Sequence, residues 1–193
     1  MNWYKTAIAV LGPVDPIVQQ YQESYENEPY DVNITGPGVN QIISISGQTI
    51  SARDLINEAV KRIRPLLIQN GVREIDTSPI GRSDAQGLAV SSKPGIVFVD
   101  IQKIFNLHRQ ALPPTAQLDG TEIDPDIIKD IINKIVQSIS GEIGETSLHE
   151  SQHMHDYMSA IQEGQPFSSV QETPAQQFGQ QMRSRYFPES FNQ

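Results

Sequence analysis

The chain has 193 residues, 37% of them hydrophobic, with a formal net charge of -9 and no cysteine. This length allows one domain with a buried core, and the absence of cysteine excludes disulfides and thiolate metal ligands. The acidic balance, without a basic stripe, argues against nucleic acid as the main partner.

The first 50 residues carry the weakest structural signals. Lys5 precedes a short apolar run at residues 6–11, which is too short for the core of a signal peptide. No run approaches the ~20 apolar residues of a membrane span, so we expect a cytoplasmic protein without a membrane segment. A turn is expected at residues 34–38 and a short strand or hairpin at 41–50 around Gly47. We treat residues 1–50 as an N-terminal segment packed on a domain formed by residues 51–193.

A helix is predicted over residues 51–70. Ser51 and Asp54 have the spacing of a capping box, and apolar residues follow at a helical period. Pro65 should kink this helix or end its regular part, and Asn70-Gly71 should stop it.

Strand-like segments follow the helix. They cover residues 72–77, 87–91 and 95–101, the last being the most apolar. Their short connections favour an antiparallel meander. A short helix at residues 101–107 and a loop at 109–120 are expected next.

Three helices are expected in the C-terminal part. The first opens at Asp124 with Pro125 and buries an isoleucine-rich stripe that ends at Ile139. Gly141 and Gly144 should break it, a second helix should cover about residues 145–162, and a third should cover 172–186. The sum is an α+β fold, with a small antiparallel or mixed sheet packed on helices.

The most informative motif is His149-Glu150-Ser151-Gln152-His153, in a chain with four histidines. On a helix, positions i and i+4 share one face, so both imidazoles can reach one zinc ion. Glu150 lies roughly 100° around the helix from His149, where it can act as general base for a metal-activated water. Because such a short motif also arises by chance, its helical setting matters.

A catalytic zinc needs a third protein ligand. Asp156 shares the face of the two histidines but lies one turn further along, so we expect it to hold a zinc-binding imidazole in one tautomer instead. Glu163 is expected to be a solvated charge at the helix end, and His155 faces away from the site. Glu172 opens a helix that can fold back beside the motif, and it is our preferred third ligand.

A second motif, Glu172-Thr173-Pro174-Ala175-Gln176-Gln177-Phe178-Gly179, completes a resemblance. Together with the first motif it resembles gluzincin metallopeptidases, and more narrowly the compact zincins of the ImmA/IrrE type, over about residues 72–187. The resemblance implies a zincin-like fold, zinc held by His149, His153 and Glu172, and Glu150 as general base. It also implies a peptide-binding edge strand just before the helices, for which residues 95–101 are the best candidate.

Two small residues of the second motif, Ala175 and Gly179, lie one turn apart. They predict a close approach of the Glu172 helix to the helix that carries the histidines.

The predicted function is zinc-dependent hydrolysis of peptide bonds in a peptide or protein substrate. Tyr157 or Tyr186 is expected to stabilise the oxyanion, because both are polar residues close to the two helices. One alternative is a non-catalytic zinc-binding structural or interaction protein, such as a phage-encoded component, in which Asp156 or His155 would complete a closed site. Another is a helical domain without metal.

Overall fold

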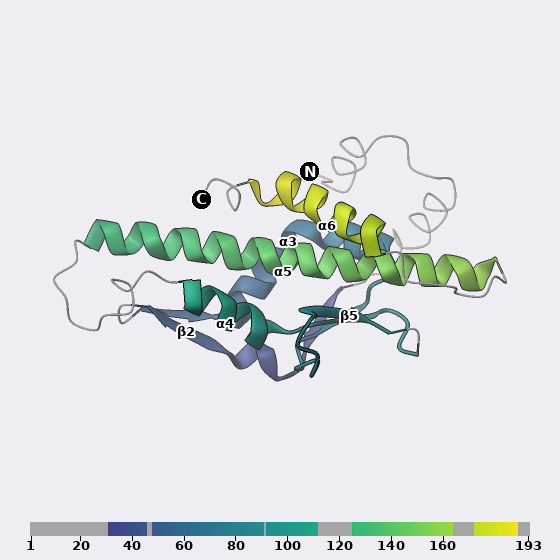
Figure 1. Cartoon of the computed structure of the whole chain (residues 1–193), viewed down its shortest axis with the longest axis horizontal. Coiled ribbons are helices and arrows are strands. Elements are labelled where there is room, and N and C mark those ends of the chain that lie inside the picture. Colours follow the sequence, from purple (N-terminus) through teal and green to yellow (C-terminus); the bar gives the residue numbers. More distant parts are fainter. Residues whose placement is uncertain (1–30, 46–47, 91, 112–124, 164–171, 189–193) are drawn as a thin grey trace.

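Helix α5 (Pro125–Gln162) is 38 residues long and runs the length of the molecule. It is one of four α-helices in the computed structural model, which describes residues 31–45, 48–90, 92–111, 125–163 and 172–188. Figure 1 shows α6 (Glu172–Tyr186) lying along one side of α5, with the strands on the other side. Among the helices of these ranges, none combines the length and apolarity of a membrane-spanning segment.

The expected break in α5 at two glycines is wrong. Gly141 and Gly144 both lie inside the continuous helix. A glycine costs a helix only about 1 kcal/mol relative to alanine, which packing can offset. At Gly144, a Cβ would lie 2.5 Å from Cζ of Phe187, a ring that is fully buried. Gly144 therefore provides room for an aromatic side chain, and the isoleucine-rich segment belongs to the same helix as the histidines.

Four of the described strands form a mixed sheet, in the order β1 (Asn33–Thr35), β4 (Glu74–Asp76), β6 (Ile96–Val99) and β5 (Gly87–Ala89). The pairs β1–β4 and β4–β6 are parallel, and β5 is antiparallel to β6. The predicted antiparallel meander is therefore wrong for residues 72–77, which pair in parallel with β6, and is confirmed for the pairing of residues 87–91 with 95–101. The fully buried side chains of Ile75, Val97 and Val99 place β4 and β6 inside the sheet.

The prediction that residues 95–101 form an edge strand is also wrong. Within the described sheet, β6 has β4 on one side and β5 on the other, so the edge strands are β1 and β5, and β5 is the edge next to β6. Both β5 and β6 pack against α5, which brings this edge beside the histidine motif.

The remaining elements follow the predictions more closely. The expected hairpin is present as β2 (Ile42–Ile45) paired antiparallel with β3 (Gln48–Ser51), while Gly47 lies outside the described residues. Helix α3 (Ala52–Gln69) continues through Pro65 and ends at the C-cap Asn70. Ser51 is its N-cap but makes no side-chain capping hydrogen bond, so the predicted capping box is wrong.

Two features near these elements go beyond the predictions. Helix α4 (Ile101–Ala111) is longer than expected and takes up the start of the predicted loop, of which residues 112–120 lie outside the described ranges. The turn at residues 34–38 contains Gly36 at φ 83° and leads into the short 3-10 helix η1 (Pro37–Asn40). Because β1 pairs with β4, residues 33–35 are part of the sheet.

One apolar core joins these elements. It includes Ile56, Ile63 and Leu67 of α3 and Ile139 and Ile143 of α5, all fully buried. The N-terminal part of α5 is less buried, and Ile131, Ile132, Ile135 and Val136 pack against the core only in part. The core thus fixes the middle of α5 against α3 and the sheet, just before the histidine motif begins.

Candidate metal centre

The candidate site lies where α5 and α6 come closest to each other. His149 and His153 are one turn apart on α5, and Glu172 is the first residue of α6. A Cβ on Gly179 would lie 3.1 Å from the carbonyl oxygen of Glu145 and 3.4 Å from Cβ of His149, and Ala175 is fully buried. The predicted role of the two small residues in close packing is therefore confirmed.

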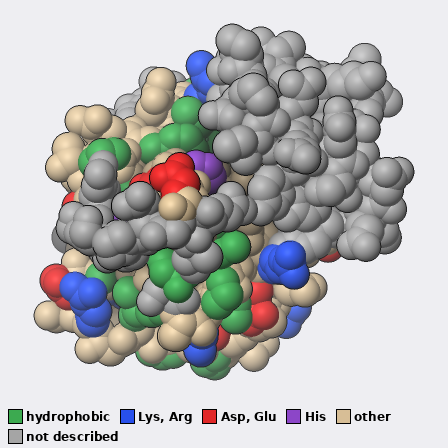
Figure 2. All heavy atoms as spheres, turned by 90° about the vertical axis from the view of Figure 1, so that its right-hand side faces the viewer, with side chains coloured by type: hydrophobic (Ala, Val, Ile, Leu, Met, Phe, Trp, Pro, Cys, Tyr) green, Lys and Arg blue, Asp and Glu red, His purple; other side chains and the backbone are tan. Residues whose placement is uncertain are grey.

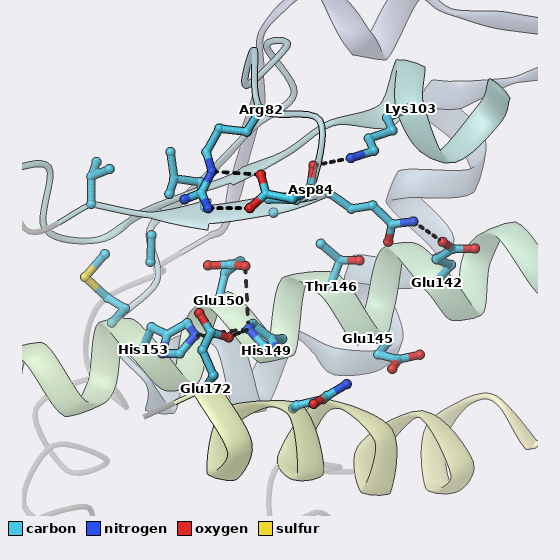
Figure 3. A pocket seen from close by; sticks show the side chains of 18 of the residues that line it. Arg82, Asp84, Lys103, Glu142, Glu145, Thr146, His149, Glu150, His153 and Glu172 are labelled. Carbon is cyan, nitrogen blue, oxygen red and sulfur yellow. Dashed lines mark hydrogen bonds and ion pairs between the residues drawn. The ribbon is translucent and has the colours of Figure 1, made fainter. Parts of the chain in front are cut away.

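Three side-chain atoms converge on one point (Figure 3). Nε2 of His149 lies 3.0 Å from Nε2 of His153 and 3.3 Å from Oε2 of Glu172, and the third distance, His153 Nε2 to Glu172 Oε2, is 3.6 Å. A tetrahedral zinc ion with ligands at about 2.0–2.1 Å would place those ligand atoms about 3.3 Å from one another. The observed triangle has this size, so the group formed by His149, His153 and Glu172 could hold a metal ion.

The surroundings favour the neutral imidazole that metal binding requires. Burial lowers the pKa of His149, and the neighbouring charge of His153 lowers it further, while Glu172 acts in the opposite direction. Neutral imidazole keeps a lone pair on one ring nitrogen, which is the atom that binds a metal. The two rings meet edge to face at an interplanar angle of 78°, so their Nε2 atoms point to a shared position instead of stacking.

The centre is open on one side. The side chain of His153 is 8% exposed, that of His149 is 21% exposed and that of Glu172 is 70% exposed. Figure 2 shows histidine and acidic side chains together at the surface, with apolar side chains nearby. All three residues line a cleft of about 800 Å³ between α5, α6 and β5. A metal held by this triangle would face that cleft.

Glu150 lies beside the triangle. Its Oε1 is 3.9 Å from Nε2 of His149, and its side chain is only 9% exposed. Burial raises the pKa of Glu150 to about 7, although a hydrogen bond from the backbone of Ala89 stabilises the charged form. Figure 3 shows its carboxylate between the strand and the imidazoles, as a proton acceptor at this site would require.

The two tyrosines predicted as oxyanion donors lie in different places. Tyr157 is half-buried and lines the cleft. Tyr186 packs partly against the apolar core, burial raises its pKa, and it is not among the residues of the cleft wall. Of the pair, the structure brings only Tyr157 to the site.

Asp156 does not take the predicted supporting role. Its Oδ1 accepts a hydrogen bond from Gln152 at 2.8 Å and lies 3.4 Å from Nδ1 of His155. The buried Nδ1 of His153 has no hydrogen-bond partner in the described structure. Asp156 follows His153 by three residues, which carries it about 4.5 Å along the helix axis past the imidazoles, a shift that a helical wheel omits.

The other residues considered as ligands stay outside the triangle. His155 pairs with Asp156, and Glu163 is exposed in the turn that follows α5. Among the described residues, the only group of three or more side chains that could hold a metal consists of His149, His153 and Glu172.

Sequence reasoning missed the wall of the cleft opposite the histidines. It is formed by β5 and the preceding loop, and it includes Arg82, Gly87 and Ala89. A glycine within a predicted strand often marks a close approach by another group, so Gly87 was the available signal.

The charged side chains of the cleft are largely paired with one another. Bonded pairs are Arg82–Asp84 at 2.8 Å, Arg183–Glu145 at 2.8 Å and Gln86–Glu142 at 2.6 Å, and Lys103 binds two backbone carbonyls. These pairs leave the carboxylates nearest the metal position, Glu150 and Glu172, as the acidic groups that face it (Figure 3).

In comparisons with known proteins, no family model matches the chain, and no curated protein or solved structure is significantly similar to it. The candidate metal centre is therefore defined by its own geometry, in which a local motif on α5 meets one carboxylate of α6.

Proposed function

We propose that this protein is a zinc-dependent peptidase in which His149, His153 and Glu172 hold the ion and Glu150 is the general base. The observation that carries the proposal is the triangle of ligand atoms, with sides of 3.0, 3.3 and 3.6 Å, beside a buried carboxylate and open to a cleft. Three protein ligands and one vacant position are the usual composition of a catalytic zinc site.

The donor set favours zinc among the common ions. Calcium and magnesium prefer oxygen ligands, whereas this group offers two imidazole nitrogens and one carboxylate. The proposed alternative, a closed structural site, needs a fourth protein ligand. Asp156 and His155, the residues considered for that role, pair with each other, which supports the catalytic reading.

A zinc ion at this position would polarise a substrate carbonyl and make a bound water more acidic. Glu150 would accept the proton that the attacking water loses as its oxygen adds to the carbonyl carbon. The carbon–nitrogen bond then breaks, and Glu150 returns the proton to the leaving amine. Tyr157, the tyrosine in the cleft wall, is our candidate donor to the oxyanion.

We further propose that an extended peptide lies along β5. This strand forms one edge of the described sheet and borders the cleft. An exposed strand edge can pair with an added strand through backbone hydrogen bonds. A mixed sheet whose edge strand runs beside the motif helix supports the zincin-like fold and the resemblance to ImmA/IrrE-type zincins.

The test combines metal analysis with peptide cleavage. Purified protein should contain about one zinc ion per chain and should cleave members of a mixed peptide library, and a chelator should stop cleavage until zinc is restored. Glu150→Gln should keep the zinc and lose cleavage. Glu163→Gln is the matched control, because it makes the same change at an exposed site near the end of the same helix. Undiminished cleavage by Glu150→Gln would refute the mechanism, and absence of zinc would refute the metal site.

A further inference from the structure

Gly87 lies in strand β5, although glycine is disfavoured inside strands. Its backbone conformation does not explain the choice. The glycines with positive φ in the described chain are Gly36, Gly71, Gly81 and Gly95, so Gly87 is in a conformation that other residues adopt readily. The reason must lie in the space that a side chain would occupy.

That space is already filled by two residues of α5. A Cβ on Gly87 would lie 2.6 Å from Cγ and 2.7 Å from Oε1 of Glu150, and 2.7 Å from Cγ2 of Thr146. These distances are shorter than non-bonded contacts of a carbon atom allow, so a side chain at position 87 would force a neighbouring group to move.

Both neighbours would have to shift, and Glu150 is the one with more freedom to move. Thr146 is β-branched and lies in the middle of a helix, where its side chain has few rotamers. Glu150 has a longer side chain with more rotatable bonds, and its carboxylate is held by a hydrogen bond from the backbone of Ala89. Turning away from an added Cβ would break that hydrogen bond and take the carboxylate away from the imidazoles.

We propose that Gly87 is a positioning residue for Glu150: its missing side chain leaves the slot in which Glu150 lies, and the Ala89 N–H fixes the carboxylate in that slot beside the metal position. The inference rests on the proposed function, because it concerns the residue assigned as general base. According to this inference, strand β5 both lines the cleft and sets the position of Glu150.

The main variant is Gly87→Ala, and its matched control is Gly144→Ala. Both changes add one methyl group against a close neighbour, but Gly144 faces Phe187 and does not line the cleft. We expect Gly87→Ala to keep its zinc and its KM while kcat falls by about tenfold or more, because a general base contributes about 10²–10⁴ to the rate. Gly144→Ala should keep the kcat of the parent protein.

A second readout does not depend on hydrolysis. With Co²⁺ in place of zinc, the visible spectrum reports the ionisation of groups at the metal, and Glu150→Gln should change its pH dependence. Gly87→Ala should change it in the same direction, and Gly144→Ala should leave it unaltered. Ala89→Pro, which removes the N–H donor at an edge strand without adding a group at Gly87, should act like Gly87→Ala and serves if that variant does not fold.

The outcomes separate the two proposals. If the parent protein binds metal but cleaves no peptide, the peptidase assignment fails, and the cobalt spectra still decide whether Gly87 positions Glu150. A Gly87→Ala spectrum identical to that of the parent protein, while Glu150→Gln shifts it, would overturn the inference. So would equal losses of kcat in the two glycine variants, or a spectrum that does not respond to Glu150→Gln.

Discussion

Removing the Glu172 carboxylate should weaken metal binding without unfolding the protein. Glu172→Ala deletes one of three ligand atoms, and the side chain is 70% exposed, so little packing is lost. The substitution also removes a negative charge from the N-terminus of α6, which is worth only about 0.3–1 kcal/mol. Folding stability without metal should therefore change by less than about 1 kcal/mol.

The expected loss of affinity follows from the number of ligands. Zinc binding by four-ligand structural sites is worth about 10–16 kcal/mol, or about 2.5–4 kcal/mol per ligand. At an exposed position, water can replace the carboxylate in part, which reduces the loss to about 2–3 kcal/mol. This corresponds to a dissociation constant roughly 30- to 150-fold higher, since about 1.4 kcal/mol is a factor of ten.

The assay is competition for zinc between each purified variant and a chromophoric chelator. Glu163→Ala is the control, because it removes an exposed glutamate outside the triangle. Thermal unfolding of the metal-free variants checks that both are folded. A dissociation constant for Glu172→Ala equal to that of Glu163→Ala would show that Glu172 does not bind the ion, and the third ligand would then have to be another group.

Three further predictions concern stability. Zinc at 100 times its dissociation constant should stabilise the parent protein by about 2.7 kcal/mol, which can be measured as a higher melting temperature. Glu172→Ala should reach the same increase only at a higher zinc concentration. Phe187→Ala should lower the free energy of unfolding in urea by about 3–5 kcal/mol, because the ring is fully buried. Adding Gly144→Ala to that variant should recover part of the loss, because the new methyl group fills space left by the ring; additive losses would contradict the contact between Gly144 and Phe187. Burial opposes ionisation of Glu142, but hydrogen bonds from His108 and Gln86 and the nearby positive charge outweigh it, so the pKa of Glu142 lies below its usual value. The stability from this pairing is therefore present above the unfolded-state pKa of about 4.3 and is lost as the pH falls through the lower folded-state pKa. Between pH 3 and 6, the urea midpoint should therefore fall less steeply with decreasing pH for Glu142→Gln than for the parent protein.

The grouping of His149, His153 and Glu172 was predictable because its signals are local. The spacing of His149 and His153 places both on one helical face whatever the rest of the fold does. The small residues Ala175 and Gly179 indicated that the two helices approach closely, and both are buried against α5. Such short-range patterns can be recognised in the sequence without knowing how the strands are arranged in the sheet.

The sheet was less predictable because strand pairing is a long-range property. Strand β5 follows β4 in the sequence but lies on the far side of β6, so β4 and β5 are not neighbours in the sheet. Parallel pairing of β1 with β4 through α3 also depends on residues 33–35, which have no clear strand pattern of their own. Hydrophobicity alone identified the most apolar strand, Ile96–Val99, but could not show that its burial requires a neighbour on each side.

Local propensity misjudged the glycines for a related reason. Gly144 weakens a helix when considered alone, yet its partner Phe187 is distant in sequence and appears only in the folded chain. Gly87 likewise owes its presence to Glu150 of another element. In both cases the glycine leaves room for a side chain from a distant part of the sequence.

The division of the ligands between two helices has a mechanical consequence. His149 and His153 belong to one continuous helix and move together, whereas Glu172 belongs to α6. An ion at the triangle would act as a cross-link between the two helices, and its release would remove that link from the first turn of α6, while packing around Ala175 and Gly179 would remain. Amide hydrogen exchange in that turn should therefore report metal occupancy in the folded protein.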